Sequence, residues 1–123
     1  MGYSFQMDIE QFRAYCLHLP FTTEACPFGP DTLVFKVKGK MFALCGISDF
    51  GRVNLKCDPE RAIILREQYP QITPGFHMNK THWNTVELEG LAHKFIQEQI
   101  RHSYELVVSG LSKKDRAEIA LGN

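Results

Sequence analysis

Apolar and polar residues alternate with two different periods along this chain, and each period predicts one type of element. Apolar residues that recur three or four positions apart form one face of an α-helix, whereas one-by-one alternation is typical of a β-strand. The helical period occurs in residues 8–18, 59–69 and 91–109, with a short last helix from Ser112. Strand alternation, or a short continuous apolar run, occurs in residues 32–38, 41–45, 52–57, 76–78 and 83–88.

Local signals mark where these elements begin and end. Asp8 and Gln11 have the spacing of a capping box, and Asp58-Pro59 places a capping residue before a proline at the first helical position. Gly39-Lys40 is predicted to turn a tight hairpin, and residues 79–81 to form the tip of a second hairpin. Residues 20–31, rich in proline and glycine, are predicted to form a structured loop whose Phe28 fills the core.

The resulting order of elements is α-β-β-β-α-β-β-α-α. Antiparallel strands with one apolar and one polar face need helices on the apolar face only. We therefore predict fold class α+β: a two-layer domain over residues 1–123, with an antiparallel sheet of about five strands and helices on one face. In the last strand Val86 and Leu88 are expected to be buried, which leaves Trp83 on the open face or at its rim.

Composition limits the classes of function. The 123 residues include 14 Lys+Arg and 14 Asp+Glu, so the formal net charge is zero, unlike that of a strongly basic nucleic-acid binder. The cysteines, Cys16, Cys26, Cys45 and Cys57, are widely spaced, and no signal peptide or membrane span is evident. We expect a cytoplasmic protein with reduced thiols and no membrane association. Residues 1–7 are expected to lie outside the fold, as a disordered or non-native leader.

Four segments of the chain resemble the MmcQ/YjbR family of small bacterial proteins: residues 34–44, 54–60, 74–86 and 103–108. The most specific part is the run His77-Met78-Asn79-Lys80-Thr81-His82-Trp83. The resemblance implies a compact α+β fold, similar in outline to bacterial frataxin (CyaY) and to secretion chaperones. It also implies a DNA-binding protein with a "double wing" of hairpins. It supplies no catalytic residues.

The first candidate site is the basic face of the sheet. Alternation places Lys36 and Lys38 on one side of their strand, and the strand 52–57 can set its own cations beside them. Clustered cations are what phosphate contact requires, although lysine is also common on any solvated sheet face. The candidate residues are Lys36, Lys38, Lys40, Arg52 and Lys56.

The second candidate site is the predicted hairpin tip near the single tryptophan. Asparagine and lysine side chains can contact bases or phosphates, and an exposed tryptophan can stack on an unpaired base. The structural alternative is a corner in which Trp83 packs on the last helices and the histidines bond to backbone. The candidate residues are His77, Asn79, Lys80, His82 and Trp83.

Two further chemistries receive little support from spacing. A metal site would need His77, His82 and a cysteine, yet zinc sites use about four ligands with near neighbours in sequence. Catalysis by Cys26 would need a histidine and an acid such as Glu24 or Asp31 beside it. Phosphate loops, nucleophile elbows and His-Glu-x-x-His motifs do not occur in the sequence. We predict no metal, no cofactor and no enzymatic activity.

The sequence therefore predicts DNA binding through basic hairpins, weak and dependent on salt. A protein-interaction or chaperone-like module that binds a protein partner is the main alternative. A small enzyme or ligand binder is the third interpretation, and it requires a pocket that joins the loop 20–31 to His77 and His82.

Overall fold

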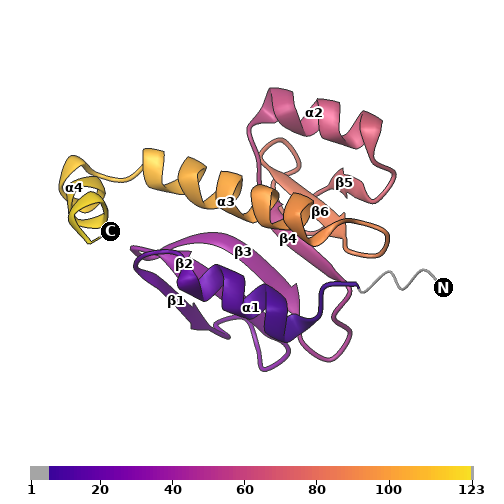
Figure 1. Cartoon of the computed structure of the whole chain (residues 1–123), viewed down its shortest axis with the longest axis horizontal. Coiled ribbons are helices and arrows are strands. Elements are labelled where there is room, and N and C mark those ends of the chain that lie inside the picture. Colours follow the sequence, from indigo (N-terminus) through magenta and orange to yellow (C-terminus); the bar gives the residue numbers. More distant parts are fainter. Residues whose placement is uncertain (1–5, 123) are drawn as a thin grey trace.

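The computed structural model describes residues 6–122 of the chain (Figure 1). Its helices are α1 (Ile9–His18), α2 (Pro59–Gln68), α3 (His93–Ser109) and α4 (Lys113–Leu121). Its strands are β1 (Thr22–Ala25), β2 (Thr32–Val37), β3 (Lys40–Gly46), β4 (Arg52–Lys56), β5 (Ile72–Pro74) and β6 (Trp83–Glu87). The predicted α+β class is confirmed.

The predicted caps of α1, α2 and α4 are confirmed at the level of individual hydrogen bonds, whereas α3 begins at His93, two residues later than predicted and without a side-chain cap. Asp8 and Gln11 form a reciprocal capping box at α1, and Asp58 caps α2 by accepting from the Arg61 N–H. Ser112 accepts from the Asp115 N–H at the start of α4. Each cap satisfies backbone donors that the first helical turn leaves without an internal partner.

Within residues 6–122 the sheet has six strands rather than the predicted five, in the order β1-β2-β3-β4-β6-β5, with every neighbouring pair antiparallel. The additional strand, β1, lies inside the segment predicted to be a loop. It pairs with β2 from Thr22 opposite Val37 to Ala25 opposite Val34. Because β1 is an edge strand with half-buried and exposed residues in alternation, it lacks the apolar run that marks an interior strand.

The partner of β6 is also different from the predicted one. Residues 72–74, not 76–78, form the strand β5, with Ile72 opposite Val86 and Pro74 opposite Asn84. Pro74 is tolerated because β5 is the edge of the sheet, where a missing N–H breaks no ladder. Residues 75–82 then form a loop, which the Gly75 N–H ties to the Trp83 carbonyl at 2.8 Å.

The β2–β3 turn lies one residue earlier than predicted. Lys38 and Gly39 have φ angles of 50° and 81°, typical of a two-residue type I′ turn, and β3 begins at Lys40. Lys38 is therefore a turn residue rather than a member of the β2 alternation. This shift changes where its side chain lies.

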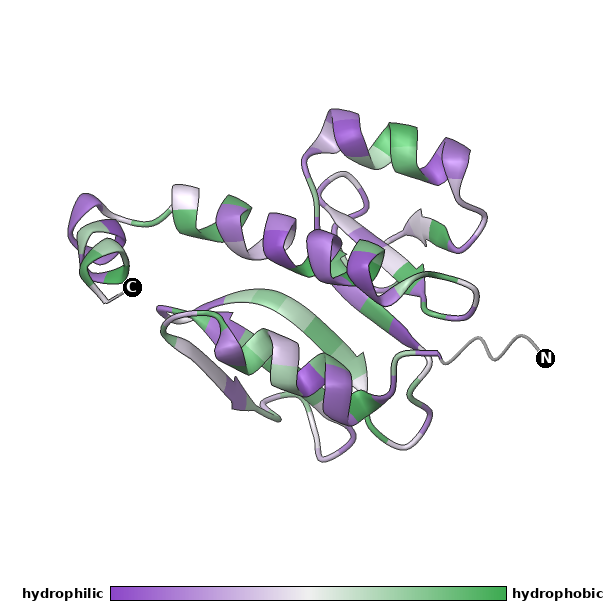
Figure 2. Ribbon diagram, in the orientation of Figure 1, coloured by the Kyte–Doolittle hydropathy of each residue, from purple (hydrophilic) through white to green (hydrophobic). Residues whose placement is uncertain are grey.

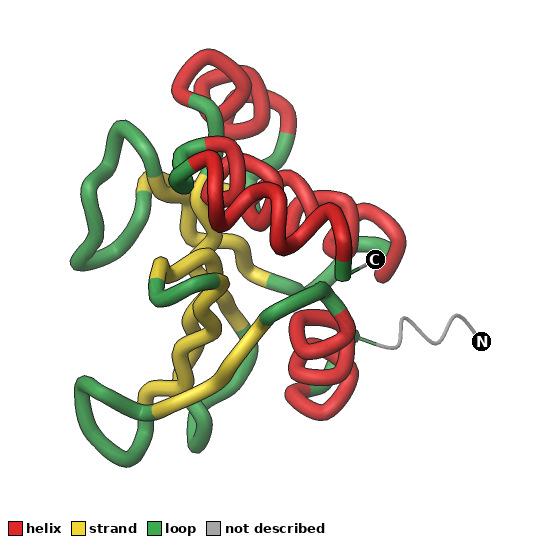
Figure 3. Tube along the Cα trace, turned by 90° about the vertical axis from the view of Figure 1, so that its left-hand side faces the viewer, coloured by secondary structure: helices red, strands yellow, loops and turns green. Residues whose placement is uncertain are grey.

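All four helices contribute to one core on a single face of the sheet (Figure 3). Strand β3, largely hydrophobic, lies under α3, whose residues alternate between hydrophobic and hydrophilic (Figure 2). The core includes Phe12, Leu19, Phe35, Phe42, Leu55, Ala62, Leu88, Ile96, Ile100 and Ile119. Met7 is also buried there, so the expected leader cannot include it; residues 1–5 lie outside the described residues. Figure 3 shows loops, not helices, on the other side of the sheet.

Candidate binding face of the sheet

The face of the sheet opposite the helices, here called the open face, is not purely polar. Val34, Leu44 and Trp83 form a second buried cluster there, with Met41 and Met78 packed against it. Strand register arranges the open face in rows across the sheet. One row contains Val34, Leu44, Asn54 and Thr85. Beyond it, Lys36 stands opposite Met41, and Lys56 stands opposite Trp83.

Trp83 lies on the open face, as predicted, but it is only 8% exposed. The loop 75–82 covers it: a Cβ on Gly75 would meet the Trp83 Cβ at 2.8 Å, so only glycine fits this approach. Trp83 therefore supports the loop. Its ring is not presented to solvent for stacking.

Three of the predicted cations meet at one end of the sheet, and we call Lys36, Lys40 and Lys56 the lysine cluster. Lys40 and Lys56 line a depression of about 370 Å³ together with Met41, Trp83 and residues 106–111 at the end of α3. Lys36 stands opposite Met41 in the β2–β3 register. Within residues 6–122, none of the three makes an ion pair.

The other two predicted cations of the sheet lie elsewhere. Lys38, in the turn, forms ion pairs with Glu118 and Asp115 of α4 and lies over the Phe21 ring. This contact lowers the pKa of Glu118, chiefly through the hydrogen bond from Lys38. Arg52 is at the opposite end of β4 from Lys56 and stands across from Glu87. Only part of the predicted basic face is therefore a cluster of free cations.

The loop 75–82 uses several of its polar groups to hold its own shape. Lys80 Nζ donates to the Gly75 carbonyl at 3.2 Å, and Asn79 Oδ1 accepts from the backbone N–H groups of Thr81 and His82. His77 and His82 are exposed, and His77 has a φ of 59°. The structure thus gives Asn79 and Lys80 structural contacts and leaves the two imidazoles at the surface.

Arg66 was not singled out in the sequence, yet it anchors this loop from α2. Its Nε donates to Asn84 Oδ1 at 2.8 Å, and its guanidinium also donates to the Lys80 carbonyl at 2.6 Å. Nothing in the helical pattern of residues 59–69 distinguishes Arg66 from the other charged residues there. Arg66 and Lys80 are 14 residues apart in sequence, and only the folded structure shows that Arg66 anchors the loop.

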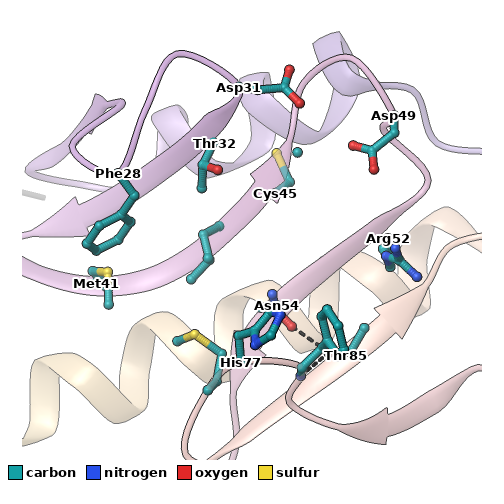
Figure 4. Close-up of a pocket in the computed structure, with 14 residues that line it drawn as sticks. Phe28, Asp31, Thr32, Met41, Cys45, Asp49, Arg52, Asn54, His77 and Thr85 are labelled. Carbon is teal, nitrogen blue, oxygen red and sulfur yellow. Dashed lines mark hydrogen bonds between the residues drawn. The ribbon is translucent and has the colours of Figure 1, made fainter.

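A pocket of about 510 Å³, here called the open-face pocket, lies on the open face between two loops (Figure 4). Phe28 and Asp31 line it from the loop before β2, and Phe76, His77 and Met78 line it from the loop 75–82. Its floor and polar wall come from the strands and the β3–β4 turn, through Thr32, Met41, Leu44, Asp49, Arg52, Asn54 and Thr85. Phe28 is 66% exposed at this pocket, so the prediction that it fills the core was wrong.

Hydrogen bonds order the polar side of the open-face pocket. Thr85 Oγ1 donates to Asn54 Oδ1 at 2.6 Å and accepts from the Phe76 N–H at 2.8 Å, as the dashed lines in Figure 4 show. Asp31 accepts from both the backbone N–H and the hydroxyl of Ser48, which lowers the pKa of its carboxyl. The loop 75–82 is therefore tied to β6, and the loop before β2 is tied to the β3–β4 turn, next to residues that line the pocket.

The cysteines and acids suggested for other chemistries are engaged elsewhere. Burial raises the pKa of the thiols of Cys16, Cys45 and Cys57, that of Cys45 to about 12. Cys26 is exposed, but Glu24 beside it in sequence is paired with Arg13. Residues 6–122 contain no group of three His, Cys, Asp or Glu side chains placed to hold a metal ion.

An antiparallel sheet with helices on one face and a loop-covered pocket on the other defines the class of this α+β domain. The YjbR family model matches residues 17–106, and the chain belongs to this family. It is 38% identical to the Escherichia coli O157:H7 protein "Uncharacterized protein YbdF", over 92% of this chain and 94% of that one. It is 31% identical to "Uncharacterized protein YjbR" of Escherichia coli K12, over 89% and 95%.

Solved structures share the fold at comparable identity. The crystal structure of Deinococcus radiodurans protein DR2400 matches with a TM-score of 0.86 and 41% identity, over 98% of this chain and 92% of that one. A crystal structure from Pseudomonas syringae matches with a TM-score of 0.69 and 34% identity, over 81% and 98%. Among the described residues, no helix combines the length and apolarity of a membrane span.

Proposed function

We propose that this protein is a cytoplasmic, non-enzymatic nucleic-acid-binding protein that uses the open face of its sheet. The lysine cluster contacts backbone phosphates, and the two loops that line the open-face pocket flank the bound strand. This proposal keeps the DNA binding that the sequence suggests but assigns it to fewer residues. Lys38 and Lys80 act in the fold through Glu118 and the Gly75 carbonyl.

The observation that supports the proposal most is the arrangement of the lysine cluster. Lys40 and Lys56 line one depression, and Lys36 stands opposite Met41, which lines it as well. None of the three lysines has an acidic partner among the described residues. Like charges brought together in this way repel each other, and phosphates relieve that repulsion while releasing counterions.

The proposal predicts modest affinity with a defined salt dependence. Each phosphate contact to a single strand contributes about −0.7 to the slope of log affinity against log salt concentration. Three contacts give a slope of about −2, so affinity should fall about 15-fold between about 50 and 200 mM salt. Zero net charge means that little long-range attraction adds to these contacts.

Fluorescence anisotropy with labelled single-stranded and duplex DNA tests the proposal. The double variant K36E/K56E should bind at least about tenfold more weakly than the natural chain at low salt, since two phosphate contacts become repulsive. K94E/K113E is the matched control, because both lysines are exposed on helices and the change in net charge is the same. An equal loss in both variants, or no loss in K36E/K56E, would contradict assignment to the lysine cluster.

The open-face pocket favours a second candidate, the binding of a small molecule. A small-molecule site requires a pocket that joins the loop 20–31 to the histidines, and Phe28, Asp31 and His77 line one cavity. His82 does not line it. A volume of about 510 Å³ is in the range of ligand sites. Ligand binding that K36E/K56E leaves unchanged would favour this candidate over phosphate docking.

A further inference from the structure

We propose that the open-face pocket accepts one unpaired nucleobase whose neighbouring phosphate lies on the lysine cluster. This inference rests on the proposed function and extends it, because it names the part of the nucleic acid that the pocket recognises. It also selects single strands over duplex, since a paired base cannot enter a cavity on the sheet surface.

The pocket presents exposed aromatic rings where a base would stack. Phe28 and Phe76 are 66% and 60% exposed, although large apolar side chains are usually covered. They lie on opposite loops and line the same cavity. Aromatic side chains that face a groove stack on the flat faces of unpaired bases, irrespective of sequence.

The backbone at Phe76 is fixed before any ligand binds. The Gly75 N–H bonds to the Trp83 carbonyl, and the Phe76 N–H bonds to Thr85 Oγ1, both at 2.8 Å. The Phe76 ring also contacts the His77 ring, with 4.0 Å between centroids. A ring held in place this way loses less conformational freedom on binding than one on a free loop.

The polar wall of the pocket matches the edge of a base rather than a purely apolar ligand. Asn54 uses its oxygen to accept from Thr85, and among the described residues no acceptor bonds to its amide nitrogen. Arg52 adds further donors and Asp49 an acceptor, and both line the pocket. Bases present donors and acceptors side by side, and asparagine and arginine are common partners for them.

The two sites are close enough for one nucleotide to reach both. Met41 lines the pocket and also the depression of the lysine cluster. Lys56 lies two residues along β4 from Asn54, which lines the pocket, and this spacing is about 7 Å. A phosphate at the lysine cluster therefore places its own base or the next one over the pocket.

The test compares two labelled strands of about twelve nucleotides, one with bases and one with abasic sites, by anisotropy at fixed low salt. The natural chain should bind the base-containing strand at least about fivefold more tightly. F28A/F76A should not distinguish the two strands. Its affinity for each should equal the affinity of the natural chain for the abasic strand. I63A/I64A is the matched control, because it removes exposed apolar side chains from α2, outside the pocket.

Each outcome decides the inference, provided that circular dichroism shows each variant to be folded. Equal affinity for both strands, still lowered by K36E/K56E, would overturn the pocket inference and leave phosphate docking in place. Absence of binding to either strand would overturn both. A free mononucleotide that displaces the labelled strand completely from the natural chain, but not from F28A/F76A, would support the pocket. The ligand of the pocket would then be the free nucleotide.

Discussion

The two faces of the sheet are built by the same strands, but they are covered in different ways. On the helix face, Phe35, Phe42 and Leu55 are each at most 2% exposed and pack against helices. On the open face, Val34 and Leu44 are buried as well, yet loops rather than helices lie over them. Loops cover the open face only in part and leave a pocket, and the lysine cluster beside it makes no ion pair with any residue that the structure describes.

This difference separates what folds the molecule from what it can bind. Side chains on the helix face are explained fully by packing, because nearly every one is enclosed by others. On the open face, Phe28 and Phe76 are mostly exposed, so packing does not explain them, and the lysine cluster is exposed at Lys40 and half-buried at Lys36 and Lys56. Functional proposals therefore belong to the open face, and stability and binding should respond separately to changes on the two faces.

The largest expected effect is on stability and comes from the helix face. Phe35→Ala should lower the free energy of unfolding by about 4 kcal/mol, because it leaves a closed cavity beside Phe12. Leu44→Ala should cost about 2 kcal/mol or less, because its side chain borders a pocket that is already open. Urea denaturation measures both; equal losses would mean that the open face is packed like the core.

A smaller effect tests how the loop 75–82 is held over the open face. Gly75→Ala should lower the free energy of unfolding by about 1–3 kcal/mol, because its Cβ would meet that of Trp83 at 2.8 Å. Gly51→Ala is the control, since the nearest atom to its Cβ would be 3.9 Å away. Comparable unfolding midpoints for the two variants would show that the loop is free to move off Trp83.

The smallest expected effect is a dependence of stability on pH, which comes from a histidine on the helix face. The Asp58 N–H donates to His102 Nε2 at 3.2 Å, and burial lowers the pKa of His102 below 6.5. Because the pKa of His102 is lowered only in the folded state, neutral His102 contributes stability above about pH 6.5. That contribution is lost as pH falls through the folded-state pKa. The melting temperature should fall by about 2 °C in that window. The fall should be absent in His102→Asn, and an equal fall there would exclude His102 as its cause.

The helix face could be predicted from the sequence because local pattern determines it. The alternation of Leu33, Phe35 and Val37 placed the apolar side of β2, and the caps at Asp8 and Asp58 marked two helix starts. The edge strands were harder. β1 has no apolar run, and β5 ends in a proline, so only pairing with β2 and β6 defines them.

The binding face could be predicted only in part. Alternation placed Lys36 and Lys56 on it, but the one-residue shift of the turn moved Lys38 toward α4. In a strand a shift of one residue reverses the direction of a side chain, so a small error in the turn removes a predicted site residue. The open-face pocket depends on contacts between distant residues, such as Asp31 with Ser48 and Gly75 with Trp83. Local pattern contains no information on such contacts.

The most direct test of the account is an NMR titration of the labelled protein with short single-stranded DNA at low salt, because it reports which face is contacted. The account predicts that shift changes concentrate at Lys36, Met41 and Lys56 and in the loop 75–82, and that raising the salt concentration reverses them. Shift changes confined to the outer surfaces of α2 and α3, or the absence of any change, would contradict the claim that the open face binds nucleic acid.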